Sequence, residues 1–207
     1  TRKMQRITSI LAAGATLGLV SAAMADITIT QGDSAPTYGT LLTFDEPGQA
    51  TGIVPADFWQ ADFGVTIAGG DGQSIVDDFD EPWIGDGNAF FGNFGIFMTF
   101  DNDLTAFSGQ IWDPSGPPSP FGGGLAVFVF NDGEQVADFS TEPAWAGAGQ
   151  EWFDIVATDG MVFDEIRILG FGFDPRTYGD NFSWNVVPGP GALAFLGLGA
   201  FARRRRG

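Results

Sequence analysis

The fold is decided by the stretch Leu125-Ala126-Val127-Phe128-Val129-Phe130, which is followed by Asn131-Asp132-Gly133. An unbroken apolar run with valine and phenylalanine predicts a β-strand that is buried on both faces. Asn-Asp-Gly at its end predicts a hairpin turn, because these residues tolerate the positive φ angles of tight turns. A further β-type run, Gln135–Phe139, follows directly. This part of the chain therefore predicts two antiparallel strands.

The same pattern extends outward in both directions. Short β-type runs separated by glycine, proline and other turn residues recur through the body, and no apolar pattern of helical period persists there. Asn181–Val187 alternates cleanly, with Phe182, Trp184 and Val186 on one face. About ten such strands in roughly 160 residues predict an all-β, jelly-roll-like sandwich. The runs are Ile27–Thr30, Leu41–Phe44, Val65–Ala68, Ile96–Phe100, Thr105–Trp112, Leu125–Asn131, Gln135–Phe139, Trp152–Thr158, Glu165–Leu169 and Asn181–Val187.

Charge is distributed very unevenly along the chain. Seven of the 9 Lys and Arg lie in residues 1–6 and 203–206, whereas all 26 Asp and Glu lie in residues 26–187. The body therefore carries a net charge of −24, with Arg167 and Arg176 as its only cations. Such a body does not bind nucleic acid, because phosphate contacts require clustered Lys or Arg. Its acidity fits either a saline habitat or the attraction of divalent cations.

The chain contains neither Cys nor His. Disulfides, thiolate nucleophiles, Ser-His-Asp triads and the usual zinc and haem ligand sets are therefore excluded. Cations bound through oxygen ligands remain possible, because carboxylates are abundant.

The N-terminus has the pattern of a secretory signal peptide. Arg2, Lys3 and Arg6 precede an uncharged apolar stretch, and Ala23-Met24-Ala25 stands before Asp26. A basic start, a short apolar core and an A-x-A site predict a signal-peptide helix over residues 1–25, with cleavage between Ala25 and Asp26 by signal peptidase. The alternatives are a buried helix and a membrane anchor.

The C-terminal tail, residues 187–207, begins with Val187-Pro188-Gly189-Pro190. An uncharged segment follows over residues 192–202, and then Arg203, Arg204, Arg205 and Arg206. A helix over that segment would span roughly 16 Å, at about 1.5 Å per residue, against a hydrocarbon core of ~30 Å. The short span favours a transient processing signal over a permanent anchor, with the arginines on the cytoplasmic side.

The Pro-rich start, short apolar helix and Arg run of residues 187–207 resemble the PEP-CTERM sorting signal of exported bacterial proteins. The resemblance implies processing by an exosortase-type membrane enzyme near the proline motif. It also implies a protein destined for the cell surface, the outer envelope or the extracellular matrix, with transient membrane anchoring. This chain departs from the family pattern at Gly189, where Glu is usual. An ordinary anchor followed by a stop-transfer Arg cluster gives nearly the same localisation.

The body, residues 26–186, carries a second resemblance. Its early Thr43-Phe44-Asp45-Glu46, central Phe100-Asp101 and Leu104–Phe107, and late Phe163–Ile168 and Gly179–Phe182 are similar to lectin-like or carbohydrate-binding-like sandwiches. Since the first and last strands of a jelly roll pair, Asp45 and Glu46 should meet Asp180 and Asn181. The resemblance implies a structural calcium at this junction, and oxygen ligands suit that ion. The alternative is that these residues are ordinary turn acids.

Sugar contacts are expected from tryptophans in loops, and Trp83 and Trp145 are the candidates. The remaining tryptophans are expected in the core. No catalytic residue is identified. The sequence thus predicts a non-catalytic, exported β-sandwich that binds extracellular polysaccharide, with membrane contact only through its terminal segments. The alternative is a secreted glycan-active enzyme that uses two carboxylates.

Overall fold

The computed structural model describes residues 26–79, 87–112, 124–140, 151–171 and 176–187. One short helix, α1 (Gln60–Phe63), accompanies twelve strands in this part of the chain. The strands are β1 (Ile27–Gly32), β2 (Thr40–Leu42), β3 (Gly52–Val54), β4 (Val65–Gly69), β5 (Ser74–Asp77), β6 (Ala89–Asn93), β7 (Ile96–Trp112), β8 (Gly124–Asn131), β9 (Glu134–Ser140), β10 (Trp152–Ala157), β11 (Phe163–Phe171) and β12 (Arg176–Val186).

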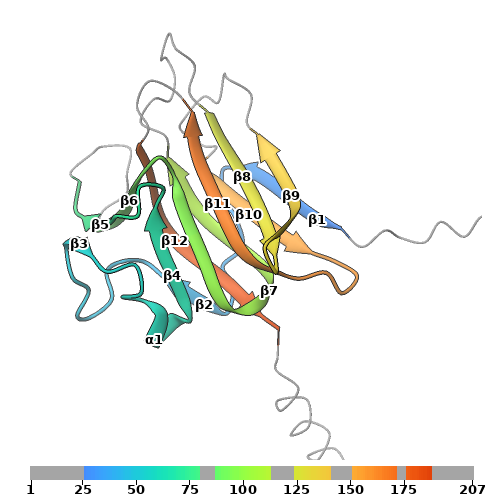
Figure 1. The fold of residues 1–207 in the computed structure, drawn as a ribbon, viewed down its shortest axis with the longest axis horizontal. Helices are drawn as coiled ribbons and strands as arrows, with labels where there is room; N and C mark the ends of the chain where they lie inside the picture. The colour runs from blue at the N-terminus through green and yellow to red at the C-terminus, as the bar shows by residue number, and fades with distance from the viewer. Residues whose placement is uncertain (1–25, 80–86, 113–123, 141–150, 172–175, 188–207) are drawn as a thin grey trace, which may run out of the picture.

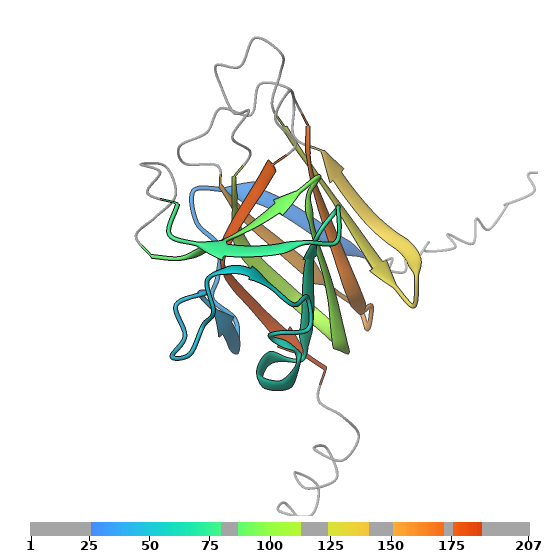
Figure 2. The same cartoon turned by 60° about the vertical axis from the view of Figure 1, so that its left-hand side comes forward.

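All the strands pair antiparallel. They form two layers, and the long strand β7 contributes one half of its length to each. Residues 96–100 of β7 pair with β4 and β11, and β8 and β9 continue this first layer. Residues 104–112 of β7 pair with β10 and β12 in the second layer. The second layer continues from β10 to β1, and from β12 to β2 and to β6, β5 and β3. In Figure 1 the first layer lies in front, and Figure 2 brings β3, β5 and β6 forward.

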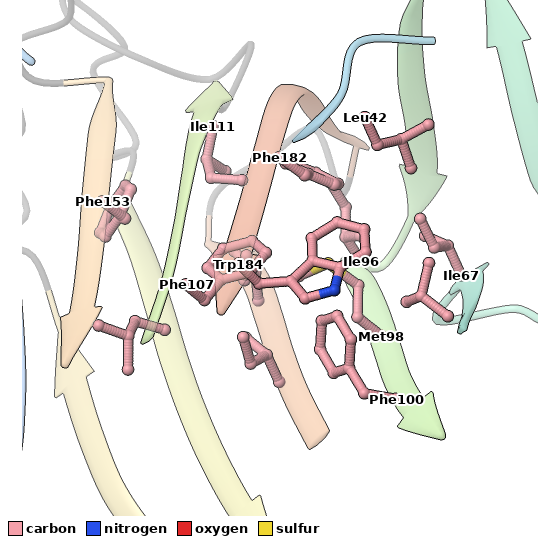
Figure 3. Close-up of a cluster of buried hydrophobic side chains, with 14 of the residues drawn as sticks. Leu42, Ile67, Ile96, Met98, Phe100, Phe107, Ile111, Phe153, Phe182 and Trp184 are labelled. Carbon is pink, nitrogen blue, oxygen red and sulfur yellow. The ribbon is translucent and has the colours of Figure 1, made fainter. Parts of the chain in front are cut away.

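The core fills the space between the two layers. Alternate residues of each strand point inward, so Met98 and Phe100 of the first layer meet Phe107 and Trp184 of the second (Figure 3). The ring centroids of Phe100 lie 6.3 Å from Phe107 and 5.4 Å from Trp184. Such aromatic contacts between facing sheets hold a sandwich together, because each buried ring removes a large apolar area from water.

The structure confirms the predicted all-β, jelly-roll-like sandwich. Each of the ten predicted runs overlaps a strand, and the runs 96–100 and 105–112 join into β7. The strands β3, β5 and β6 were not predicted. The prediction that β8 is buried on both faces is wrong, because Phe128 and Phe130 are only partly buried while the alternating Val127 and Val129 are buried. The two predicted terminal helices lie outside the described residues.

A segment that precedes β2, residues 33–39, lies against the outer face of the second layer. The carbonyl oxygen of Pro36 accepts a 2.5 Å hydrogen bond from Ser108 Oγ, and Tyr38 N donates to Ser183 Oγ at 2.9 Å. The Tyr38 hydroxyl donates to Asp154 Oδ1 at 2.6 Å. The pKa of Tyr38 is raised, mainly by burial and to a smaller extent by this hydrogen bond. These bonds explain how two serines in the middle of an outward face are buried.

Candidate functional site

The candidate site lies beside β12, where two short neighbouring strands leave a gap. β2 pairs with β12 as far as Leu42 opposite Phe182, and β6 pairs with it as far as Phe90 opposite Gly179. Between these points β12 has a bulge, because its register with β7 shifts between Asp180 and Ser183. Asn181 is the extra residue, with a φ of 53°. Residues of the two flanking loops approach β12 at this gap.

Asp180 is the most enclosed carboxyl of this gap, with 6% of its surface exposed. Its Oδ1 accepts a 2.6 Å bond from Asn181 N, and its Oδ2 accepts from Asn181 Nδ2 at 2.9 Å. Asn181 Nδ2 also donates to Gln110 Oε1 at 2.7 Å. Burial raises the pKa of Asp180 to about 7, although the backbone bond from Asn181 opposes this; the nearby charges of Asp45 and Glu46 raise it further.

The other two acids come from the loop after β2. Phe44, with a φ of 61°, is fully buried, and the chain on either side of it holds Thr43, Asp45 and Glu46 near β12. Glu46 Oε1 accepts bonds from Thr43 N at 2.7 Å and Thr43 Oγ1 at 3.1 Å. Glu46 Oε2 is buried and has no hydrogen-bond partner. An unpaired buried carboxylate oxygen is costly, so this atom marks a place where a cation would be favourable.

Asp45 connects this loop to the residues before β6. Its Oδ1 accepts bonds from Asn88 N at 2.9 Å and Asn88 Nδ2 at 2.8 Å. Gly87, with a φ of 102°, lies so close to Asp45 Oδ2 that a side chain there would collide with it. We call Asp45, Glu46, Asn88, Asp180 and Asn181 the β12 junction.

The structure thus brings together the four residues that the sequence indicated as metal ligands. The predicted metal ligands did not include Asn88, Gln110 or Thr43, which hydrogen-bond them. Asn88 directly precedes β6, and because β6 was not predicted there was no signal to place this residue. Whether the four residues bind a metal stays a prediction.

The donor chemistry of the β12 junction fits calcium, but the arrangement is not a ready-made ligand set. Carboxylate and amide oxygens are the ligands that calcium prefers, and Glu46 Oε2 is unengaged. Among the described residues, however, no three acidic side chains are grouped closely enough to hold a metal ion. Asp45 and Asp180 already accept hydrogen bonds from neighbouring asparagines. Calcium would therefore have to exchange some of these bonds.

Several predicted sites fall outside the described residues. They are Trp83 and Trp145, the cleavage residues Ala23 and Ala25, and the sorting residues Pro188, Gly189, Pro190 and Arg203 to Arg206. Asp26 is described, and its carbonyl oxygen accepts a 2.9 Å bond from Thr158 N beside β1. Val187 N donates to the Asp103 carbonyl oxygen at 2.8 Å.

Within the described ranges, no helix has the length and apolar character needed to cross a membrane.

Comparison with known proteins finds matches only among solved structures. No family model matches the chain, and no curated protein matches it. A family 43 arabinoxylan arabinofuranohydrolase from Bacillus subtilis, in complex with cellotetraose, shares 9% identity over 56% of this chain, with a TM-score of 0.34. This chain spans only 25% of that enzyme.

Two smaller proteins are covered more fully. A family 6 carbohydrate-binding module shares 12% identity over 67% of this chain and 95% of its own, with a TM-score of 0.26. CsCBM6-3 from Clostridium stercorarium, in complex with cellobiose, shares 10% identity over 66% of this chain and 95% of its own, with a TM-score of 0.24. All of these identities and TM-scores are low.

Proposed function

We propose that the chain is an exported, non-catalytic β-sandwich protein that binds extracellular polysaccharide at the cell surface or in the matrix. The observation that carries the non-catalytic role is the state of Asp180. This carboxyl has the perturbed pKa of a catalytic acid, yet only 6% of it is exposed and both oxygens accept bonds from Asn181. A general acid must come within hydrogen-bond reach of its substrate. Asp180 is instead held by its neighbour Asn181 at the bulge of β12.

Export is supported by the two ends of the sequence. The basic, apolar and A-x-A order of residues 1–25 and the proline, apolar and arginine order of residues 187–207 are both typical of processing signals. Mass spectrometry of the protein isolated from its cells tests this directly. We expect a mature N-terminus at Asp26 and a C-terminus near Pro188. A protein that retains both segments would contradict export by these signals.

We further propose that calcium stabilises the β12 junction. The buried and unpartnered Glu46 Oε2 and the negative charges of Asp45 and Glu46 near Asp180 both favour a bound cation. At about 100 times its Kd, a ligand that binds only the folded state adds about 2.7 kcal/mol to the free energy of unfolding.

The corresponding prediction is a rise of several degrees in Tm when calcium replaces a chelator at equal ionic strength. Glu46→Gln should abolish this rise, and Asp71→Asn, on an exposed carboxyl of another loop, should retain it. An unchanged Tm in the wild-type protein would exclude the calcium site. The proposal that the protein binds polysaccharide would still stand.

A glycan-active enzyme is the second candidate, and one observation favours it. A carboxyl with a pKa of about 7 close to other carboxylates is the arrangement that glycosidases use for proton transfer. If Asp180 acts in this way, its replacement by Asn should abolish hydrolysis of a polysaccharide substrate.

A further inference from the structure

Three phenylalanines stand on the outer face of the first layer, where a sheet normally presents polar side chains. They are Phe97 of β7 and Phe128 and Phe130 of β8, and each is partly exposed. The inward residues on either side of them, such as Met98 and Val129, belong to the core. None of the three phenylalanines is part of a buried hydrophobic cluster of the described residues. Their apolar surface therefore has no role in the core packing described above.

Arg167 of β11 lies among these rings. β11 runs between β7 and β8, so Arg167 pairs with Phe97 on one side and Phe128 on the other. Its guanidinium carbon is 4.4 Å from the ring centroid of Phe130 and 5.7 Å from that of Phe97. Arg167 Nε also donates to Glu165 Oε1 at 2.5 Å. The stacked guanidinium fixes the orientation of the rings and the ion pair neutralises its charge.

A chain segment covers the outer face of one layer of the sandwich, whereas the outer face of the other layer is open among the described residues. Residues 33–39 lie over the second layer and hydrogen-bond Ser108 and Ser183. In Figure 1 the first layer faces the viewer, and no described segment crosses β11 and β8. The aromatic face, defined here as Phe97, Phe128, Phe130 and Arg167, is thus an apolar surface that extends across the neighbouring strands β7, β11 and β8.

We infer that this aromatic face binds the pyranose rings of an uncharged polysaccharide. Aromatic rings fixed side by side offer flat apolar surface to sugar rings. The polar side chains on the neighbouring strand positions are threonine, glutamine, one aspartate (Asp138) and the Arg167–Glu165 ion pair. Adjacent strands are about 4.8 Å apart, so the side chains of β7 and β8 stand ~10 Å apart across β11, comparable with a disaccharide. The net charge of −24 on the body disfavours an anionic polymer. This inference rests on the proposed polysaccharide binding and assigns it a surface.

Affinity electrophoresis of the full-length protein tests the assignment, with mixed-linkage β-glucan, galactomannan and xyloglucan as uncharged polymers and polygalacturonate as the charged one. We expect at least one uncharged polymer to retard the wild-type protein. The double variant Phe128→Leu/Phe130→Leu should bind at least tenfold more weakly, because leucine keeps the apolar volume but lacks a flat ring. Phe128→Tyr/Phe130→Tyr, which keeps both rings, should bind within twofold of wild type.

Ile53→Ser provides the control for general loss of exposed apolar surface, since Ile53 is 73% exposed on β3 in the other layer. Its binding should match that of wild type. If wild type binds and the leucine variant binds equally well, the aromatic face is the wrong surface while the proposed function stands. If polygalacturonate alone retards the protein, the uncharged ligand class is wrong. If no polymer retards the wild-type protein, the proposed function fails together with this inference.

Discussion

Replacing Phe44 by alanine should lower the free energy of unfolding by about 3–5 kcal/mol, the usual cost of truncating a fully buried phenylalanine. Phe44 is 0% exposed and its ring lies 5.4 Å from Phe182, 5.5 Å from Trp59 and 5.9 Å from Phe90. Its φ of 61° is strained for a bulky residue, so this packing must outweigh the local cost. Urea unfolding followed by tryptophan fluorescence measures the loss.

Phe94 offers a matched control because its φ angle is nearly the same and its side chain is not buried. Its φ is 58° and its exposed fraction is 59%. Phe94→Ala should change the free energy of unfolding by less than about 0.5 kcal/mol, as for other surface substitutions. Equal losses in the two variants would show that the ring of Phe44 does not hold the loop of the β12 junction in place.

The second large effect concerns pH. The pKa of Asp180 is about 7 in the folded protein, mainly because of burial, whereas an unperturbed aspartate has a pKa of about 3.9. Between these values the folded state holds a proton that the unfolded state releases, so stability decreases as pH rises. The stabilisation is fully present below about pH 4 and is lost as pH passes about 7. The full shift corresponds to at most about 4 kcal/mol.

Asp180→Asn isolates this contribution from that of the other acids. Asparagine does not titrate, so the fall in unfolding free energy between pH 5 and pH 8 should be smaller in the variant by at most about 2.5 kcal/mol. Chelator is present throughout, since a bound cation would lower the pKa of Asp180. Asp71→Asn should keep the wild-type slope, because the pKa of Asp71 is lowered, chiefly by a backbone hydrogen bond from Gln73. Identical slopes in wild type and Asp180→Asn would contradict the burial of a protonated Asp180.

Much of the fold could be predicted because apolar runs and turn residues mark most strands. β6 escaped prediction because Gly92 interrupts a short run, and glycine is depleted in strands. The structure explains this glycine, since a side chain there would collide with the backbone of Gly95. β7 appeared as two strands because Asp101, Asn102 and Asp103 resemble a turn. They are exposed where β7 passes between layers.

The main residues of the β12 junction could be predicted from the sequence because the topology of a jelly roll brings them together. A jelly roll pairs early and late strands, and β2 does pair with β12, which brings Asp45 and Glu46 towards Asp180. The bulge at Asn181 and the partnership of Asp45 with Asn88 depend on register and on an unpredicted strand. The aromatic face was hidden because an unbroken apolar run cannot distinguish a strand buried on both faces from one with exposed rings.

The central claim, a polysaccharide-binding protein without catalysis, is tested most directly by measuring binding and turnover on the same samples. The full-length protein is incubated with the uncharged polysaccharides, and gel retardation and the release of reducing ends are recorded together. We predict retardation by at least one polymer and no release of reducing ends above the blank. Release of reducing ends by the wild-type protein that disappears in Asp180→Asn would contradict the claim and identify a glycan-active enzyme.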